Sequence, residues 1–376
     1  MNDGVKRRLL LLSVSAGAGH ARAADAIRAC AETEYHAEVA HWDVMDHVSA
    51  AFRALYTKFY LRLIERHPLI WAQLYQITDR TPPDAPLQRL RRIVERLNAR
   101  ALREAIAAFA PDAVICTHFL PAELLMRERS RGRLACPVWV QVTDFDLHAL
   151  WVVPNMDGYF AASDEVAFRM RARGLPSERI HVTGIPIMPP FGHPPDRREC
   201  AREAGLDPDR LTFLLMSGGA GIGALDEVAA ELLDLDEDFQ IVALAGRNAR
   251  LQEALHALAQ RYPKRLFPQG YTHQIERLMC IANVAITKPG GLTTAECLAI
   301  GLPMIVHAPI PGQEERNCDY LLEHGAALKA VDRVALRYRV LELLHDPTRI
   351  EELGRRARLL GRPDAARRVL ERVFSS

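Results

Sequence analysis

The chain of 376 residues lacks any apolar run near the roughly 20 residues that a membrane-spanning helix needs. Its seven cysteines are scattered and form no Cys-x-x-Cys pair, which argues against a disulfide framework or zinc site and predicts a reducing compartment. No recognised nucleic-acid-binding motif accompanies its basic stretches, so nucleic acid is not an expected partner. Apolar residues make up 49% of the chain and charged residues 25%. These values predict a globular protein long enough for two domains.

The N-terminus also lacks a signal peptide of the usual form. Lys6-Arg7-Arg8 and four leucines resemble one, but the apolar core is short and runs into a glycine-rich turn at residues 15–19. We therefore predict a first strand at residues 9–14 and a helix at 20–31. The dinucleotide fingerprint G-x-G-x-x-G is missing from this turn.

His20 stands at the start of this predicted helix, at the carboxyl end of a strand, where α/β sheets bind ligands. A neutral imidazole there could take a proton from a hydroxyl group. A capping or solvated histidine explains the position equally well at this point.

The rest of the chain repeats a strand–helix pattern in two halves. Short apolar runs that end in polar or glycine-rich turns predict further strands at 113–117, 138–142, 158–162, 180–183, 212–216, 240–245, 283–286 and 304–307, with another beginning at Phe267. Five prolines within residues 184–195 predict a stiff linker between the halves. The expected domains are 1–185 and 197–360, joined by a linker at 186–196, with a C-terminal helix at 361–376 that packs back toward the first domain.

A glycine turn in the second half predicts an anion site. Pro289-Gly290-Gly291 separates the strand at 283–286 from a predicted helix at 292–300. A strand, a glycine turn and a helix N-terminus leave backbone N–H groups pointing at an anion, usually phosphate. Thr293 could add a hydroxyl donor, and Glu296 lies one turn on, where its oxygens suit a ribose diol. An ordinary βα turn is the alternative.

Two other segments could contribute to a ligand site. Residues 217–223 form a second glycine-rich turn after a strand. The polar cluster at 309–317 follows a strand end, where it could read ligand hydroxyls or could be a solvated loop. Asp144 and Asp146 form a D-x-D pattern that could bind a divalent ion. Because a single D-x-D arises often by chance, we predict no metal site.

Aromatic and basic residues gather in the segment 51–104. They are Phe52, Arg53, Tyr56, Lys58, Phe59, Tyr60, Arg62, Arg66, Trp71, Tyr75, Arg89, Arg91, Arg92, Arg96, Arg100 and Arg103. Such residues on amphipathic helices suit an interfacial surface that binds anionic lipids. A packed domain helix with a solvated face is the alternative.

Four motifs in this order resemble the monogalactosyldiacylglycerol synthase and processive diacylglycerol glucosyltransferase family. They lie at residues 15–20, 142–148, 181–186 and 287–296, and the similarity extends from about residue 9 to about residue 330. The resemblance implies an α/β fold with two doubly wound, Rossmann-like domains facing a cleft, the GT-B glycosyltransferase fold. The peptidoglycan N-acetylglucosaminyltransferases and UDP-GlcNAc 2-epimerases are more distantly similar.

The resemblance also implies roles for single residues. His20 matches the proposed general base on the acceptor hydroxyl, although Gly17-Ala18-Gly19 stands where many members have three glycines. Asp144 and His148 match an acceptor-side motif. The residues that match the donor site are Gly218, Gly219, Tyr271 (uracil), Gly290, Gly291, Thr293 (diphosphate), Glu296 (ribose), Gln313 and Glu314 (sugar hydroxyls).

The implied activity is transfer of glucose or galactose from a UDP-sugar to diacylglycerol, with inversion and without a metal cofactor. The expected partners are the UDP-hexose, diacylglycerol and anionic lipids, at the cytoplasmic face of a membrane and without a transmembrane helix. Two alternatives remain: a UDP-GlcNAc 2-epimerase or another UDP-sugar enzyme with a non-lipid acceptor, and a non-catalytic lipid- or nucleotide-binding protein.

Overall fold

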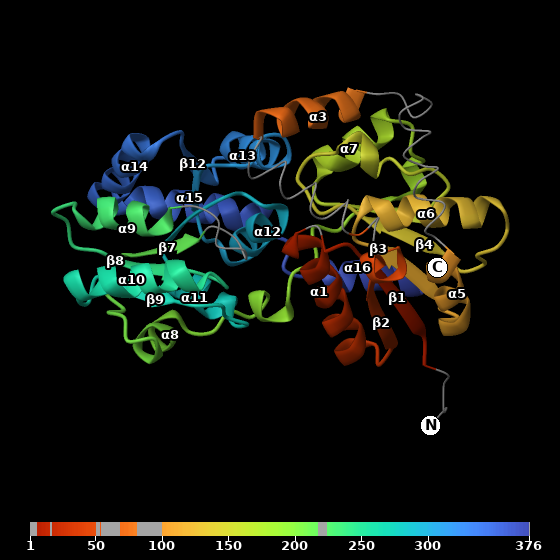
Figure 1. Cartoon of the computed structure of the whole chain (residues 1–376), viewed down its shortest axis with the longest axis horizontal. Helices are drawn as coiled ribbons and strands as arrows, with labels where there is room; N and C mark the ends of the chain where they lie inside the picture. The colour runs from red at the N-terminus through yellow and green to blue at the C-terminus, as the bar shows by residue number, and fades with distance from the viewer. Residues whose placement is uncertain are drawn as a thin grey trace. The chain divides into compact units, whose positions relative to one another are not determined.

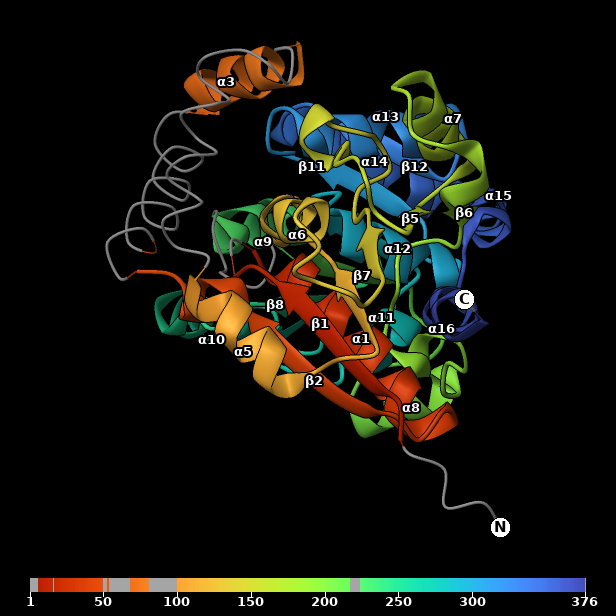
Figure 2. The same ribbon diagram turned by 90° about the vertical axis from the view of Figure 1, so that its right-hand side faces the viewer.

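A computed structural model describes the chain at residues 6–15, 17–49, 53, 68–80, 100–216 and 224–375. The chain forms two compact units (Figures 1 and 2). The first unit comprises Met1–Pro189, Pro311–Gln313 and Asp364–Ser376, and the second comprises Pro190–Ile310 and Glu314–Pro363. Each unit is built on its own sheet. No helix within the described ranges is both long enough and apolar enough to cross a bilayer.

The first unit contains a parallel six-stranded sheet in the order β2-β1-β3-β4-β5-β6. Its strands are β1 (Arg8–Ser13), β2 (Glu38–Asp43), β3 (Ala113–Cys116), β4 (Val138–Gln141), β5 (Gly158–Ala161) and β6 (Ile180–Val182). The central strands are buried on both faces, which explains their continuous apolar runs. β1 lies beside β3 with Leu12 opposite Cys116, and β3 lies beside β4 with Cys116 opposite Val140. The residues that follow these strands therefore emerge at one edge of the sheet.

Helices complete the first unit. Among the described residues they are α1 (Ala18–Glu34), α3 (Pro68–Arg80), α5 (Arg100–Phe109), α6 (Phe119–Ser130), α7 (Asp164–Ala172) and α16 (Ala365–Ser375), with short 3-10 turns η1 (Val44–His47), η2 (Ala149–Trp151) and η3 (Ser177–Arg179). The C-terminal helix α16 packs against α1, and its Val369 and Leu370 are fully buried in the same core as Ile27 of α1. The last residues of the chain thus complete the core of the first unit.

A partly buried hydrogen-bond chain fixes α1 against the first two strands. Ser13 Oγ lies 2.8 Å from His41 Nε2, and His41 Nδ1 lies 3.0 Å from Asp25 Oδ1. The three residue types are those of a hydrolase triad, but Ser13 is only 1% exposed, so a substrate has no access to its hydroxyl. We interpret this chain as structural.

The second unit repeats the architecture with the strand order β12-β11-β10-β7-β8-β9, again all parallel. Its strands are β7 (Thr212–Met216), β8 (Gln240–Leu244), β9 (Leu266–Gln269), β10 (Val284–Thr287), β11 (Met304–His307) and β12 (Ala327–Ala330). Its helices include α8 (Arg197–Glu203), α9 (Leu225–Leu233), α10 (Ala249–Arg261), α11 (Ile275–Ile281), α12 (Gly291–Ile300), α13 (Gln313–Glu323), α14 (Arg333–His345) and α15 (Pro347–Leu360).

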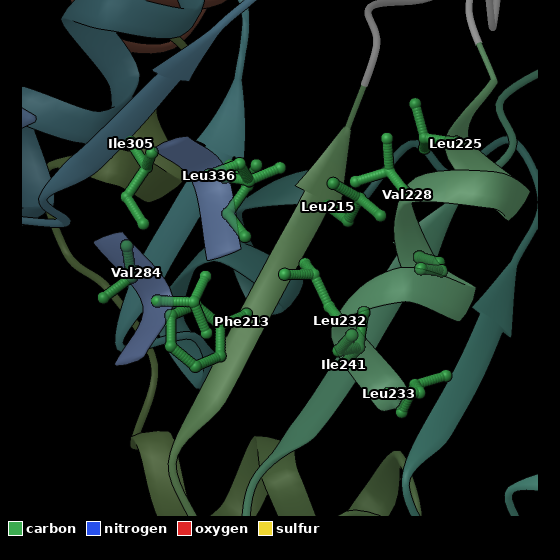
Figure 3. Close-up of a cluster of buried hydrophobic side chains, with 14 of the residues drawn as sticks. Phe213, Leu215, Leu225, Val228, Leu232, Leu233, Ile241, Val284, Ile305 and Leu336 are labelled. Atoms are coloured by element: carbon green, nitrogen blue, oxygen red, sulfur yellow. The ribbon is translucent and has the colours of Figure 1, made fainter. Parts of the chain in front are cut away.

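Strand and helix side chains interlock in the core of the second unit. Phe213 and Ile241 from neighbouring strands pack with Leu232 of α9 and Leu336 of α14 (Figure 3). Phe213 also meets Phe239 edge to face, with ring centroids 5.6 Å apart. Burial of side chains of this size contributes about 1.5–3 kcal/mol each, which holds the sheet that carries the strand-end loops.

The predicted fold class is confirmed: each half is a doubly wound α/β unit on a parallel sheet. Two strands escaped prediction, β2 and β12. Both are edge strands, and β2 (Glu-Val-Ala-His-Trp-Asp) has no fully buried residue, so it lacks the apolar run by which its neighbours are recognised. The strands that were predicted are mostly those with two buried faces.

Candidate functional site

In the first unit, the carboxyl edge of the sheet holds His20 through two threonines. Gly17 precedes α1 with φ 130°, a conformation that favours glycine and turns the chain from strand into helix. His20 Nδ1 lies 3.0 Å from the carbonyl oxygen of Thr117 and 2.9 Å from Thr143 Oγ1. The hydroxyl of Thr117 donates to the carbonyl oxygen of His20 at 2.9 Å. Thr117 follows β3, and Thr143 lies just beyond β4, so adjacent strand ends fix this imidazole.

Aromatic rings surround the His20 imidazole. The His118 ring meets it edge-on at a centroid distance of 4.6 Å, and Trp151 lies at 6.1 Å. Burial lowers the pKa of His20 to about 4, while the hydrogen bond to the Thr117 carbonyl acts in the opposite direction. Burial and the neighbouring His20 ring also hold the pKa of His118 well below its usual range. Both rings are therefore neutral at physiological pH, and a neutral ring can accept a proton.

Asp146 and His148 of the 144–148 motif make different contacts. Asp146 is buried and lies 3.3 Å from Arg169, so one carboxylate of the D-x-D pattern is committed to an ion pair. His148 accepts from the Leu150 amide at 3.1 Å through Nδ1, and its Nε2 lies 3.1 Å from the carbonyl oxygen of Tyr75. These contacts attach α3 to the sheet. In the described parts of the chain, no group of three His, Cys, Asp or Glu side chains is arranged to hold a metal ion.

In the second unit, the predicted glycine turn begins α12 as expected. Gly290 is the N-cap, and the first intrahelical hydrogen bond runs from the Thr294 amide to the Gly290 carbonyl at 2.8 Å. The amides of the first turn, including those of Gly291 and Thr293, have no acceptor within the helix and can face an anion. Asn317 of α13 donates to the Pro289 carbonyl at 3.0 Å, which fixes the turn.

Two acidic residues flank this turn. Glu296 lies in α12 and is 4% exposed. Glu314, 8% exposed, accepts from the Ile310 amide at 2.6 Å through Oε2. A methyl group built on Gly290 would lie 3.8 Å from Glu314 Oε1. The Glu314 carboxylate therefore lies beside the glycine turn.

The structure describes two of the four remaining residues that were predicted for the UDP-sugar site. Tyr271 follows β9 and is 44% exposed, with the Arg247 guanidinium 4.3 Å from its ring centroid and His273 against its edge. Gln313 begins α13. Gly218 and Gly219 lie outside the described residues. Tyr271 presents an accessible aromatic ring on which a base could stack.

Comparison with known proteins identifies the family. The family model for monogalactosyldiacylglycerol synthase matches residues 20–187, and that for the glycosyltransferase family 28 C-terminal domain matches residues 213–369. A processive diacylglycerol beta-glucosyltransferase of Bacillus pumilus is 32% identical over 278 residues, which cover 74% of this chain and 72% of the relative. The chain belongs to the glycosyltransferase family of the processive diacylglycerol beta-glucosyltransferases. The corresponding protein of Bacillus subtilis is 30% identical over 279 residues, with the same coverage.

Solved structures agree on the fold of this glycosyltransferase. Acinetobacter baumannii MurG has a TM-score of 0.65 at 17% identity, covering 98% of this chain and 100% of its own. A UDP-glucosyltransferase from Polygonum tinctorium has a TM-score of 0.64 at 13% identity, covering 99% and 100%. At these identities the likeness concerns the fold alone. It confirms the GT-B architecture that the motifs implied.

The aromatic and basic segment of this glycosyltransferase is described only in part. Of its predicted interfacial residues, Phe52, Tyr56, Lys58, Phe59, Tyr60, Arg62, Arg66, Arg89, Arg91, Arg92 and Arg96 lie outside the described residues. On α3, Tyr75 is buried against His148, with ring centroids 4.4 Å apart. Ile70 and Ile77, which are neither aromatic nor basic and were not among the predicted interfacial residues, are 54% and 55% exposed. They lie two helical turns apart and so share one face of α3.

Sequence reasoning assigned no role to the residues that hold His20. Thr117, His118 and Thr143 are buried polar residues that follow the apolar runs of two strands. A polar residue at the end of such a run is a signal that the sequence does show. The contacts of these residues with a histidine 97 to 123 residues away in the chain depend on β1, β3 and β4 being neighbours, an order that the sequence does not show.

Proposed function

We propose that this enzyme transfers glucose from UDP-glucose to the hydroxyl of diacylglycerol at a membrane surface and forms a glycolipid. The observation that carries the proposal is the match to diacylglycerol beta-glucosyltransferases over 72% of their length. The chain also carries a neutral, oriented histidine in one unit and, in the other, a glycine turn at a helix N-terminus whose first-turn amides suit an anion. We propose glucose rather than galactose as the transferred sugar because these relatives are named as glucosyltransferases.

The proposed reaction is a direct displacement with inversion at the anomeric carbon. The diacylglycerol hydroxyl attacks, and His20 takes its proton. Glu314 binds sugar hydroxyls, Glu296 binds the ribose, and Tyr271 stacks on the uracil. The amides at Gly291 and Thr293, together with the positive end of the α12 dipole, stabilise the departing UDP without a metal ion. Asp144 acts on the acceptor side, and Gly218 and Gly219 form a second wall of the donor site.

The test is an assay on vesicles that contain diacylglycerol and anionic lipid. UDP-glucose and UDP-galactose are supplied separately with a chelator, and the lipids are analysed by mass spectrometry. We expect glucosyl-diacylglycerol, unaffected by the chelator. His20→Ala should lower turnover by about 10²–10⁴-fold, the usual contribution of a general base. His256→Ala, at an exposed histidine of α10, is the matched control and should retain activity.

Near-normal turnover by His20→Ala would remove His20 from the role of base. Absence of glycolipid from either donor, together with conversion of UDP-GlcNAc in the absence of lipid, would replace the proposal with the epimerase alternative.

A further inference from the structure

Thr117 holds His20 at both its backbone and its ring. Its hydroxyl donates to the His20 carbonyl, and its own carbonyl oxygen lies 3.0 Å from His20 Nδ1. A carbonyl oxygen can only accept a hydrogen bond, so a neutral imidazole in this position must carry its proton on Nδ1. The opposite tautomer would direct the Nδ1 lone pair at the carbonyl lone pairs. Nε2 is then the unprotonated nitrogen of the ring.

Thr143 brings a second oxygen to the same nitrogen. Its Oγ1 lies 2.9 Å from His20 Nδ1, and the residue is 4% exposed. The single Nδ1 proton is therefore shared between the Thr117 carbonyl and the Thr143 hydroxyl. No described residue forms a hydrogen bond to Nε2. The ring is held at one nitrogen and open at the other.

We propose that Thr143 is a positioning residue for the transfer reaction: with the Thr117 carbonyl, it fixes His20 as the Nδ1–H tautomer and leaves Nε2 to receive the acceptor's proton. This assignment rests on the proposed function, in which His20 is the base. It adds a residue that acts through His20 rather than on the substrate.

The effect of Thr143 should appear when His20 becomes charged. Proton transfer from the diacylglycerol hydroxyl to Nε2 makes an imidazolium, whose Nδ1–H bonds to neutral oxygens become charge-assisted and about twice as strong. The titratable group packed on the ring is His118, whose Nδ1 accepts from the Leu120 amide at 3.0 Å and whose charged form burial disfavours. Oxygen atoms of the two threonines therefore stabilise the charged ring. Loss of one of them should slow turnover by about fivefold to tenfold.

The first measurement compares Thr143→Val, which removes the hydroxyl at similar size, with Thr143→Ser, which keeps it. Thr143→Val should lower kcat by about fivefold to tenfold without changing KM for UDP-glucose, and should move the acidic limb of the kcat/KM profile to lower pH. Thr143→Ser should behave as wild type in both respects. A merely structural role would change expression or stability but would not move the pH profile.

The second measurement does not depend on activity. Nitrogen-15 NMR of histidine-labelled enzyme, with the His20 signals assigned from His20→Ala, reports which ring nitrogen carries the proton. We expect Nδ1 protonated and Nε2 unprotonated at pH 7 in the wild type, and greater tautomer exchange in Thr143→Val. Thr183→Val removes a buried hydroxyl from the same sheet, 3.1 Å from the Gly184 carbonyl, and should leave the His20 signals unchanged.

Three outcomes would overturn the assignment: a His20 ring protonated on Nε2 at pH 7, His20 signals of Thr143→Val identical to wild type, or a Thr143→Val pH profile identical to wild type. These are distinct from failure of the proposed function, which would appear as active His20→Ala whatever the tautomer. The NMR result then still decides whether Thr143 holds the ring.

Discussion

Burial of His20 predicts that the first unit loses stability as the pH falls from neutrality. The pKa of His20 is about 4 in the folded protein and 6.5 for an ordinary histidine. Below pH 6.5 this histidine therefore binds a proton in the unfolded chain, whereas in the folded chain it stays neutral until the pH nears 4. The contribution of neutral His20 to the free energy of unfolding is complete above pH 6.5 and is lost progressively toward pH 4. At 1.36 kcal/mol per pH unit, and with allowance for the partly exposed ring, the loss at pH 4.5 is about 2 kcal/mol.

The perturbation is His20→Gln, which keeps an N–H donor for the Thr117 carbonyl but does not titrate in this range. Urea unfolding is measured from pH 7.5 to 4.5 by tryptophan fluorescence. All four tryptophans (Trp42, Trp71, Trp139 and Trp151) lie in the first unit, so the signal reports that unit selectively. Between these pH values the wild type should lose about 2 kcal/mol more than the variant.

Parallel pH curves for the wild type and His20→Gln would refute this reasoning, because the buried imidazole would then contribute no linkage between folding and proton binding. His256→Gln, at an exposed position on α10, is the control and should follow the wild type. His118 remains in every variant, and because burial is the main cause of its low pKa, most of its contribution cancels between the curves.

Two further predictions concern other parts of the enzyme. Gly290→Ala adds a methyl group that, among the described residues, meets only Glu314 Oε1, at 3.8 Å, so thermal stability should be unchanged while the KM for UDP-glucose rises about tenfold or more; an unchanged KM in donor titrations would place the sugar elsewhere. Ile70→Glu with Ile77→Glu on α3 should reduce binding to anionic vesicles by about tenfold in sedimentation assays, whereas Val334→Glu, at a 77% exposed residue of α14, should not. Equal losses in both would indicate a non-specific charge effect.

Much of the fold is predictable because its central strands are buried on both faces. The leucines of β1 and the apolar runs of β3, β4 and β7 are recognisable without knowledge of their neighbours. Edge strands such as β2 carry no such signature, since solvent covers part of each residue. The glycine turn before α12 is equally local, because its geometry depends on three consecutive residues.

The candidate site is only partly predictable because its contacts join distant segments. His20 was recognisable from its place after a glycine loop, but its partners Thr117 and Thr143 come from strands whose order in the sheet is not local information. Tyr75 shows the opposite error: its place among the aromatic and basic residues of the segment 51–104 favoured a membrane surface, whereas its ring packs against His148 in the interior. Composition shows that a segment is rich in aromatic residues but not which of those residues are covered.

The low pKa of His20 indicates when, in the proposed reaction, the acceptor's proton would be removed relative to the departure of UDP. A base whose conjugate acid has a pKa near 4 removes a proton from an alcohol only late, when the bond to the leaving group is already largely broken. Such a reaction would depend mainly on stabilisation of the departing diphosphate, which the proposal assigns to the amides of Gly291 and Thr293 at the α12 N-terminus. Thr143→Val should then lower kcat/KM for UDP-glucose by a smaller factor than Gly290→Ala does. The reverse order would mean that proton transfer, rather than departure of UDP, limits the rate.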